Sequence, residues 1–123
     1  MKIFHNEEIY IKTDNFSDSI FKENTMFFDI ETTGFSPVKA IVYMIGCARR
    51  IKNGIDQYFA ESVDDEAAVI EAFAGSLSGC STIISFNGVG FDIPFLKNKY
   101  KKYKQDDPFC NVQILDIFKE LSP

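Results

Sequence analysis

Two acidic residues on one expected strand have a spacing that could carry chemistry. Asp29 and Glu31 lie two positions apart in the apolar segment 26–31, so both side chains leave the same face of a strand. With the carboxylates about 6 Å apart and an effective dielectric of about 20, their repulsion is on the order of 3 kcal/mol. A divalent cation relieves that cost, and oxygen-only ligands favour Mg²⁺ or Mn²⁺. From the spacing alone, a strand that ends at the surface with both acids solvated explains the pair equally well.

The residues around this pair resemble a known nuclease motif. Phe-Asp-Ile-Glu-Thr-Thr-Gly at 28–34 resembles the first motif of the DnaQ-like (DEDD) 3′–5′ exonucleases. Asn-Gly-Val-Gly-Phe-Asp at 87–92 resembles their second motif, an Asn followed at a fixed interval by an aromatic residue and Asp. The fuller wording of both segments is similar to the YprB-like branch of ribonuclease-H-like proteins, across about residues 26–118. Two motifs in this order are more specific than an isolated pair of acids.

The resemblance implies a metal-dependent nuclease that releases nucleotides from a 3′ end. Asp29 would bridge two metal ions, with Glu31 and Asp92 each holding one side of the pair. In two-metal hydrolysis the ions sit about 3.5–4 Å apart, one activating water and the other stabilising the leaving oxygen. The implied cofactors are therefore Mg²⁺ or Mn²⁺, and the implied partner is the 3′ end of a DNA or RNA strand.

The same resemblance places six further residues on the substrate side: Thr32, Thr33, Gly34, Asn87, Phe91 and Asp116. Residues 32–34 would form a loop along the terminal nucleotide, with Gly34 letting the backbone approach closely, although an ordinary turn has the same composition. Asn87 is expected either to hydrogen-bond the nucleic acid or to cap its own turn. Asp116 would lie behind the metal ligands or beside the substrate, or else cap a helix.

The sequence departs from the family pattern on its C-terminal side. The family carries a fourth carboxylate on a later helix, preceded by a Tyr or His general base, as Tyr-x-x-x-Asp or His-x(4)-Asp. Tyr-x-x-x-Asp occurs at 10–14 and 103–107, but neither position matches, and the one His, His5, lies in the N-terminal arm. We therefore expect the C-terminal helix, the fourth carboxylate and the general base to be missing. The alternative to an active nuclease is a remnant or fragment that binds metal or nucleic acid, or serves as an interaction module.

The elements that must position these residues follow from the apolar pattern. Short apolar or β-branched segments bounded by turn residues predict strands at 26–31, 41–49, 55–60, 81–86 and within 111–118. Asp64 and Asp65 predict the start of a helix that reaches Leu77, with apolar residues at helical spacing. A second helix is expected from Asp92. This order predicts an α/β fold with a mixed five-stranded sheet flanked by helices, which the resemblance makes ribonuclease-H-like.

The chain is long enough for one domain. Residues 1–25 are expected to form an N-terminal arm with a short edge strand near 8–12, and residues 26–123 the exonuclease domain, incomplete at its C-terminal side. Its 123 residues and 14.0 kDa support one modest core. No apolar run suits a membrane span, no secretory signal is present, and three separated cysteines indicate a cytoplasmic protein. We expect a homo-oligomer that forms through the sheet face left uncovered by the missing helix.

The charge pattern favours no partner strongly. A formal net charge of −5 argues weakly against a general nucleic-acid coat protein, but it does not exclude an enzyme whose acids hold metal. Five lysines lie between residues 97 and 104, interleaved with two tyrosines. Such a helix could guide a phosphate backbone and stack bases, or present a solvated face with its tyrosines packed inward.

Overall fold

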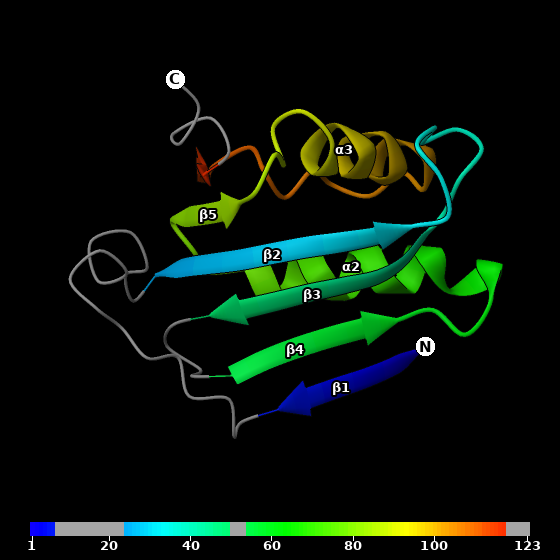
Figure 1. Cartoon of the computed structure of the whole chain (residues 1–123), viewed down its shortest axis with the longest axis horizontal. Helices are drawn as coiled ribbons and strands as arrows, with labels where there is room; N and C mark the ends of the chain where they lie inside the picture. The colour runs from blue at the N-terminus through cyan, green and yellow to red at the C-terminus, as the bar shows by residue number, and fades with distance from the viewer. Residues whose placement is uncertain (7–23, 50–53, 118–123) are drawn as a thin grey trace.

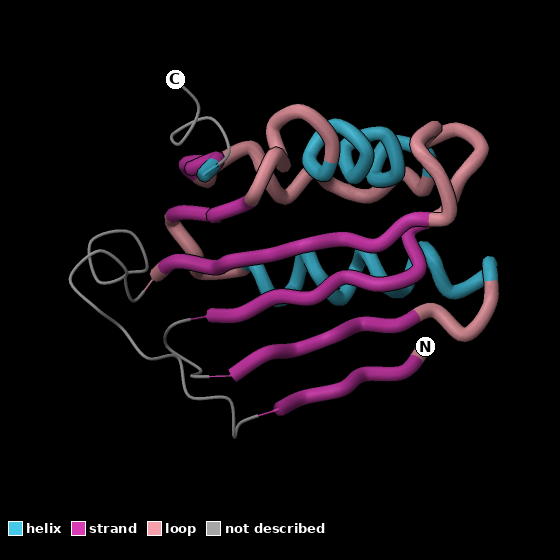
Figure 2. The backbone as a smooth tube through the Cα atoms, in the orientation of Figure 1, coloured by secondary structure: helices cyan, strands magenta, loops and turns pink. Residues whose placement is uncertain are grey.

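The computed structural model describes residues 1–6, 24–49 and 54–117, which form a mixed six-stranded sheet with helices packed on it (Figure 1, Figure 2). In chain order the strands are β1 (Lys2–Asn6), β2 (Thr25–Thr32), β3 (Val42–Arg49), β4 (Gly54–Phe59), β5 (Thr82–Ser85) and β6 (Gln113–Asp116). Across the sheet their order is β1-β4-β3-β2-β5-β6. The first four of these pair antiparallel, whereas β2, β5 and β6 pair parallel. The predicted α/β class and mixed sheet are confirmed.

The sheet has one strand more than the five predicted. β1 pairs with β4 over its full length, from Lys2 opposite Phe59 to Asn6 opposite Ile55. The N-terminal arm therefore extends the sheet, while the edge strand predicted near residues 8–12 lies outside the described residues. The sequence signal for β1 was weak because all five of its residues are exposed, so no buried face marks it as a strand.

The helices begin close to the predicted positions. A 3₁₀ turn at Val63–Asp65 leads into α2 (Glu66–Leu77), and α3 spans Asp92–Lys102. Asp65 stands at the N-cap position of α2, but the predicted cap is not formed, because its carboxylate accepts a hydrogen bond from the Glu61 N–H at 2.9 Å. Gly79 has a φ of +85°, the left-handed conformation in which the chain leaves α2.

Helix α2 covers one face of β2 and β3, and α3 runs along the β2 side of the same layer (Figure 1). Phe73 of α2 meets Phe28 of β2 at 5.3 Å between ring centroids and Phe109 at 6.1 Å. The Tyr100 hydroxyl of α3 donates a hydrogen bond to the Ile70 carbonyl of α2 at 2.5 Å. These contacts fix β2 and α3, the two elements that carry the predicted metal ligands, against a shared core.

The opposite face of the four antiparallel strands carries exposed aromatic side chains. Phe4, Phe27 and Phe59 are 53%, 39% and 39% exposed. The strand register places them on the same face as Asp29. Within the part of the chain that the structure describes, no helix covers this face (Figure 1), and no helix is long and apolar enough to cross a membrane.

Candidate active site

Asp29 and Glu31 project from β2 on the open face of the sheet. The strand alternates as predicted: Phe28 and Ile30 are buried in the core, whereas both acids are exposed. Opposite Asp29 on β3 stands Gly46, which has no side chain. The Asp29 carboxylate therefore borders a shallow hollow of about 200 Å³ on the sheet face.

Asp92, the first residue of α3, is a buried acid beside these carboxylates, with 6% of its surface exposed. The pKa of Asp92 is raised from 3.8 to about 6. Burial is the largest cause, and the negative charge of the neighbouring Asp29 is the second. A backbone hydrogen bond from Ile30 opposes the shift, and Asp116 and Glu31 add smaller increases. The Asp92 Oδ2 atom is buried without a hydrogen-bond partner. Such an oxygen among like charges is costly unless a proton or a cation joins it.

Asp116 of β6 holds the loop that delivers Asp92. Its buried carboxylate accepts hydrogen bonds from the backbone N–H groups of Asn87 at 2.8 Å and Val89 at 3.2 Å. Asn87 has a φ of +59°, a left-handed conformation that Asn adopts more readily than most residues. The Asp116 side chain therefore contacts the backbone of the second motif.

Two glycines give this loop its shape. A β-carbon at Gly88 would overlap the side chain of Ser85 and lie 3.7 Å from the Asp92 β-carbon, so only glycine fits there. A β-carbon at Gly90 would lie 3.0 Å from Asn87 Oδ1. The Asn87 side chain thus lies beside Gly90 of its own turn.

The loop after β2 is closed by hydrogen bonds of Thr32, the last residue of β2, and of Thr33. The Thr32 hydroxyl donates to the Gly34 carbonyl at 2.7 Å, and the Ile41 N–H donates to the Thr33 hydroxyl at 2.9 Å. The Thr33 N–H also donates to the Ile41 carbonyl at 3.0 Å. A β-carbon at Gly34 would lie 3.4 Å from that of Ala40, an ordinary contact, so the loop's own packing does not require glycine.

Phe35 is a candidate site residue that the sequence analysis did not single out. Its side chain is 90% exposed and meets the half-buried Phe91 edge-on, with ring centroids 6.2 Å apart. Phe91 in turn packs against Phe95 of α3 at 5.4 Å. The two motif loops therefore meet through aromatic rings, one residue before Asp92. An aromatic residue directly after the first motif was the signal that could have found Phe35.

The predicted metal ligands are neighbours, but in the described part of the chain they are not close enough to coordinate one ion together. Within residues 1–6, 24–49 and 54–117, no three His, Cys, Asp or Glu side chains lie close enough together to hold a metal ion. Asp92 lies within electrostatic reach of Asp29, whereas Glu31 affects it least among the neighbouring acids. The donors are nonetheless carboxylate oxygens, one of them buried and unpartnered, which suits a hard divalent cation. The residues fit Mg²⁺ or Mn²⁺ in chemical kind, in an arrangement more open than a bound ion requires.

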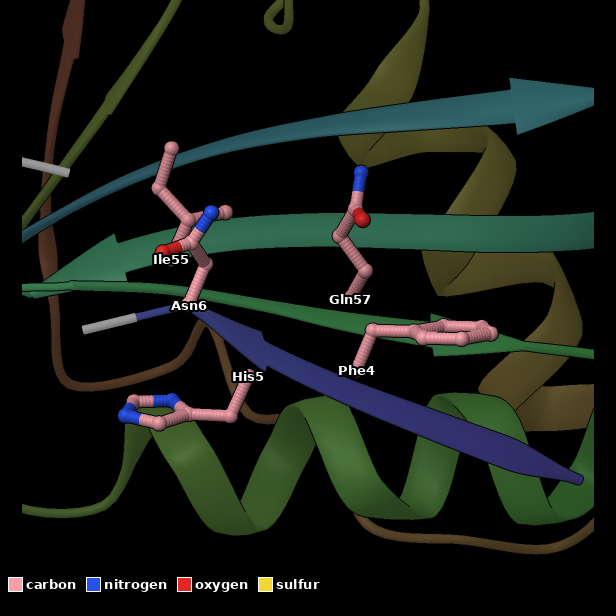
Figure 3. Close-up of a pocket in the computed structure, with 5 residues that line it drawn as sticks. All are labelled: Phe4, His5, Asn6, Ile55 and Gln57. Atoms are coloured by element: carbon pink, nitrogen blue, oxygen red, sulfur yellow. The ribbon is translucent and has the colours of Figure 1, made fainter. Parts of the chain in front are cut away.

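A separate pocket of about 370 Å³ lies over β1 and β4. It is lined by Phe4, His5, Asn6, Ile55 and Gln57 (Figure 3). The imidazole of His5 pairs with Asp56 on β4. This pocket contains none of the predicted metal or substrate residues, so the candidate site remains the edge where β2, the two motif loops and α3 meet.

A protein-family model described as the RNase_H superfamily matches residues 26–123. The chain belongs to the RNase H superfamily. The resemblance to ribonuclease-H-like proteins is thereby confirmed, and the matched segment includes Asp29, Glu31 and Asp92. No curated protein sequence matches the chain.

Solved structures similar to this RNase H superfamily member include a family B DNA polymerase from Pyrobaculum calidifontis, with a TM-score of 0.62 and 19% identity over 76% of this chain and 15% of the polymerase. Exonuclease I in its apo form gives a TM-score of 0.59 and 18% identity over 79% of this chain and 29% of that protein. E. coli exonuclease I in complex with a dA16 oligonucleotide gives a TM-score of 0.55 and 16% identity, over 76% of this chain and 28% of that protein. The chain spans less than a third of each, and at these identities the likeness shows the fold.

Proposed function

We propose that this domain is a divalent-metal-dependent nuclease of the 3′–5′ exonuclease type, which hydrolyses nucleic-acid phosphodiesters. The observation that carries the proposal is the buried carboxylate of Asp92, whose Oδ2 has no partner and on whose pKa Asp29 has the largest effect of the neighbouring charges. A carboxylate buried among like charges lowers the stability of the folded chain, which is typical of functional sites. Superfamily membership and similarity to exonuclease structures support the same chemistry.

Asp29, Glu31 and Asp92 are the residues that would hold two Mg²⁺ or Mn²⁺ ions. They supply oxygen donors from β2 and from the start of α3. Bound there, the ions would activate a water molecule and stabilise the leaving 3′ oxygen. Without cations, these carboxylates repel a phosphodiester, so we expect nucleic acid to bind at the site only when the ions are present.

The substrate we propose is a single strand with a free 3′ end, held beside the carboxylates by the two motif loops. Phe35 and Phe91 offer ring surfaces on which an unpaired base can stack, and stacking accepts any base. Residues 32–34 and Asn87 would line the path of the terminal nucleotide. E. coli exonuclease I has been solved with dA16 and dT13 oligonucleotides, which supports a single-stranded ligand for this chain.

The test is degradation of a 5′-labelled single-stranded oligonucleotide by the 123-residue chain in Mn²⁺. We expect a ladder that shortens from the 3′ end. Asp29→Ala should abolish the ladder, because it removes one of the three carboxylates that would hold the ions. Asp106→Ala, which changes an exposed acid in the loop after α3, is the matched control and should leave the ladder unchanged.

The result that would contradict the proposal is a ladder that survives Asp29→Ala, since cleavage would then come from another site or a contaminant. Absence of cleavage by the unmodified chain, with Mn²⁺ binding retained, would instead indicate the second candidate below.

The second candidate function is a metal- or nucleic-acid-binding domain or interaction module without catalysis. Two observations favour it: the described residues form no closed metal cluster, and the open sheet face exposes Phe4, Phe27 and Phe59. Exposed apolar patches of this kind are common in interaction surfaces. We propose that this face mediates self-association, and light scattering at increasing protein concentration tests it: a mass that stays at 14.0 kDa would contradict the proposal.

A further inference from the structure

A buried ion pair lies behind the candidate site, between α2, α3 and the loop after β2. The Lys99 and Glu66 side chains are 1% and 0% exposed, and Lys99 Nζ lies 3.2 Å from Glu66 Oε1. The sequence analysis placed Lys99 in a basic patch on α3. The structure corrects this assignment, because Lys99 points into the core while the other four lysines of that patch are exposed.

The pair is hydrogen-bonded to the backbone on both sides. Glu66 Oε2 accepts a hydrogen bond from the Val42 N–H at 2.6 Å, and Glu66 Oε1 accepts one from the Tyr103 hydroxyl at 2.6 Å. Lys99 Nζ donates to the Ala40 carbonyl at 2.6 Å. Glu66 is the first residue of α2 and Lys99 lies in the last turn of α3, so each charge stands at the helix end that stabilises it.

The backbone groups that this pair binds belong to the end of the first-motif loop. Ala40 and Val42 flank Ile41, whose N–H and carbonyl both bond Thr33 at the loop's start. Lys99 belongs to α3, and α3 begins with Asp92. The loop that carries Phe35 and the helix that carries Asp92 are therefore joined through one buried contact.

Stability alone is a poor reason for this contact. Burying two charges costs desolvation that a well-packed apolar pair avoids, so buried ion pairs contribute little net stability compared with apolar replacements. The pair instead supplies directional hydrogen bonds: its ammonium and carboxylate bind two backbone groups and one hydroxyl.

We propose that Lys99 and Glu66 are positioning residues, which hold the first-motif loop against α3 so that Asp29, Asp92 and the Phe35–Phe91 contact keep their relative placement. The inference rests on the proposed nuclease function for its catalytic consequence. Its structural content, the attachment of residues 33–42 to α3, can be measured without any ligand.

The experiment compares three variants of the full chain. Lys99→Met removes the ammonium and leaves Glu66 buried without its cation. Glu66→Gln combined with Lys99→Met removes both charges, so the unfolding midpoint should return toward that of the unmodified chain while the bond to Ala40 stays lost. Lys97→Met is the matched control, because it makes the same change at an exposed position of the same helix.

Two readouts follow for the charge-neutral double variant. Amide hydrogen exchange of residues 33–42 in the ligand-free protein should rise by about tenfold or more, with β2 and α2 unchanged. The rate of oligonucleotide cleavage in Mn²⁺ should fall by about 100-fold, because displaced catalytic groups lose rate steeply. Lys97→Met should leave the amide exchange of residues 33–42 unchanged.

Unchanged exchange of residues 33–42 in the double variant would overturn the inference, whatever happens to cleavage. Raised exchange with an unchanged cleavage rate would also overturn it, because the loop would then move without consequence for the reaction. If the unmodified chain cleaves nothing, the proposed nuclease function fails by itself, and the exchange measurement still decides whether this pair holds the loop.

Discussion

Glu66 and Asp92 are both buried carboxylates, yet their surroundings are opposite. Glu66 is fully buried and bonds an ammonium, a hydroxyl and a backbone N–H. Asp92 is 6% exposed, has one oxygen without a partner, and faces the negative charges of Asp29, Asp116 and Glu31. The fold therefore satisfies one buried acid completely and leaves the other incomplete.

The difference separates a carboxylate whose partners the protein supplies from one that keeps an unpartnered oxygen. An unpartnered buried oxygen costs free energy that neighbouring donors could remove, as they do at Glu66. Among the described residues, the Ile30 backbone hydrogen bond favours the charged form of Asp92, and the Oδ2 atom has no partner. A cation held by Asp92 and Asp29 would complete the site that the protein itself leaves open.

The largest effect on stability is expected at Glu66, the carboxylate with a full set of partners. Lys99→Met should lower the free energy of unfolding by about 3–5 kcal/mol, since it strands the Glu66 carboxylate in the core. Urea denaturation followed by circular dichroism measures the change, with Lys97→Met as the control. A loss no larger than that of the control would show that Glu66 does not depend on Lys99.

Removing the charge of Asp92 is expected to raise stability instead. With a pKa of about 6 in the folded state against 3.8 unfolded, the folded protein holds the Asp92 proton more tightly, so Asp92 lowers stability as pH rises from about 4 to about 6. Two units correspond to about 3 kcal/mol. In EDTA, Asp92→Asn should therefore raise the free energy of unfolding by up to about 3 kcal/mol above pH 6 and by little below pH 4.

Urea titrations of both proteins at several pH values test this difference, and Asp106→Asn serves as the control. A gain that is the same at every pH would contradict the assignment to Asp92 ionisation. Mn²⁺ should stabilise the unmodified chain and have less effect on Asp92→Asn, because the variant lacks the open carboxylate.

Asp116 provides a smaller test, since it is buried, hydrogen-bonded and still one of the charges that Asp92 faces. Asp116→Ala should lower stability by about 1–3 kcal/mol by leaving the Asn87 and Val89 N–H groups unpaired. It should also lower the pKa of Asp92, because one repelling charge is removed. Carboxyl-carbon NMR titration measures that pKa, and an increase would contradict the electrostatic description.

The last effect, of similar size, is on binding and concerns the contact between Phe35 and Phe91, next to Asp92. Phe35→Ala should weaken binding of a single-stranded oligonucleotide by about 1–3 kcal/mol, the contribution of one stacked base, with little change in folding. Fluorescence anisotropy in a divalent buffer measures the affinity. Val38→Ala changes another exposed apolar residue of the same loop and should have no effect, and equal losses for both variants would contradict base stacking on Phe35.

Much of the fold was predictable because it is encoded locally. The alternation in β2, the helical spacing of α2 and the start of α3 at Asp92 all follow from short-range patterns, and each was confirmed within a residue or two. β1 was missed because an exposed five-residue segment has no buried face, and its pairing with β4 joins residues 49 to 57 positions apart.

The sequence predicted which acidic residues belong to the candidate site, but not how the residues around them are arranged. The sequence motifs named Asp29, Glu31 and Asp92, and the family model confirms the superfamily to which those motifs belong. Lys99 was misplaced on a basic surface, because charge and spacing along α3 do not reveal which lysine meets a buried acid from another helix. Phe35 was passed over for a similar reason: its contact with Phe91 depends on how two loops meet.

The amino-acid sequence by itself determined the order of the elements from β2 onward, the shared face of Asp29 and Glu31, and the superfamily, because these depend on residue type and on spacing within one segment. Only the tertiary structure decided that Asp92 is left without a full set of partners and that Glu66 receives one. Whether a buried charge is satisfied depends on which groups from distant segments surround it, and that set exists only once the sheet and helices have packed.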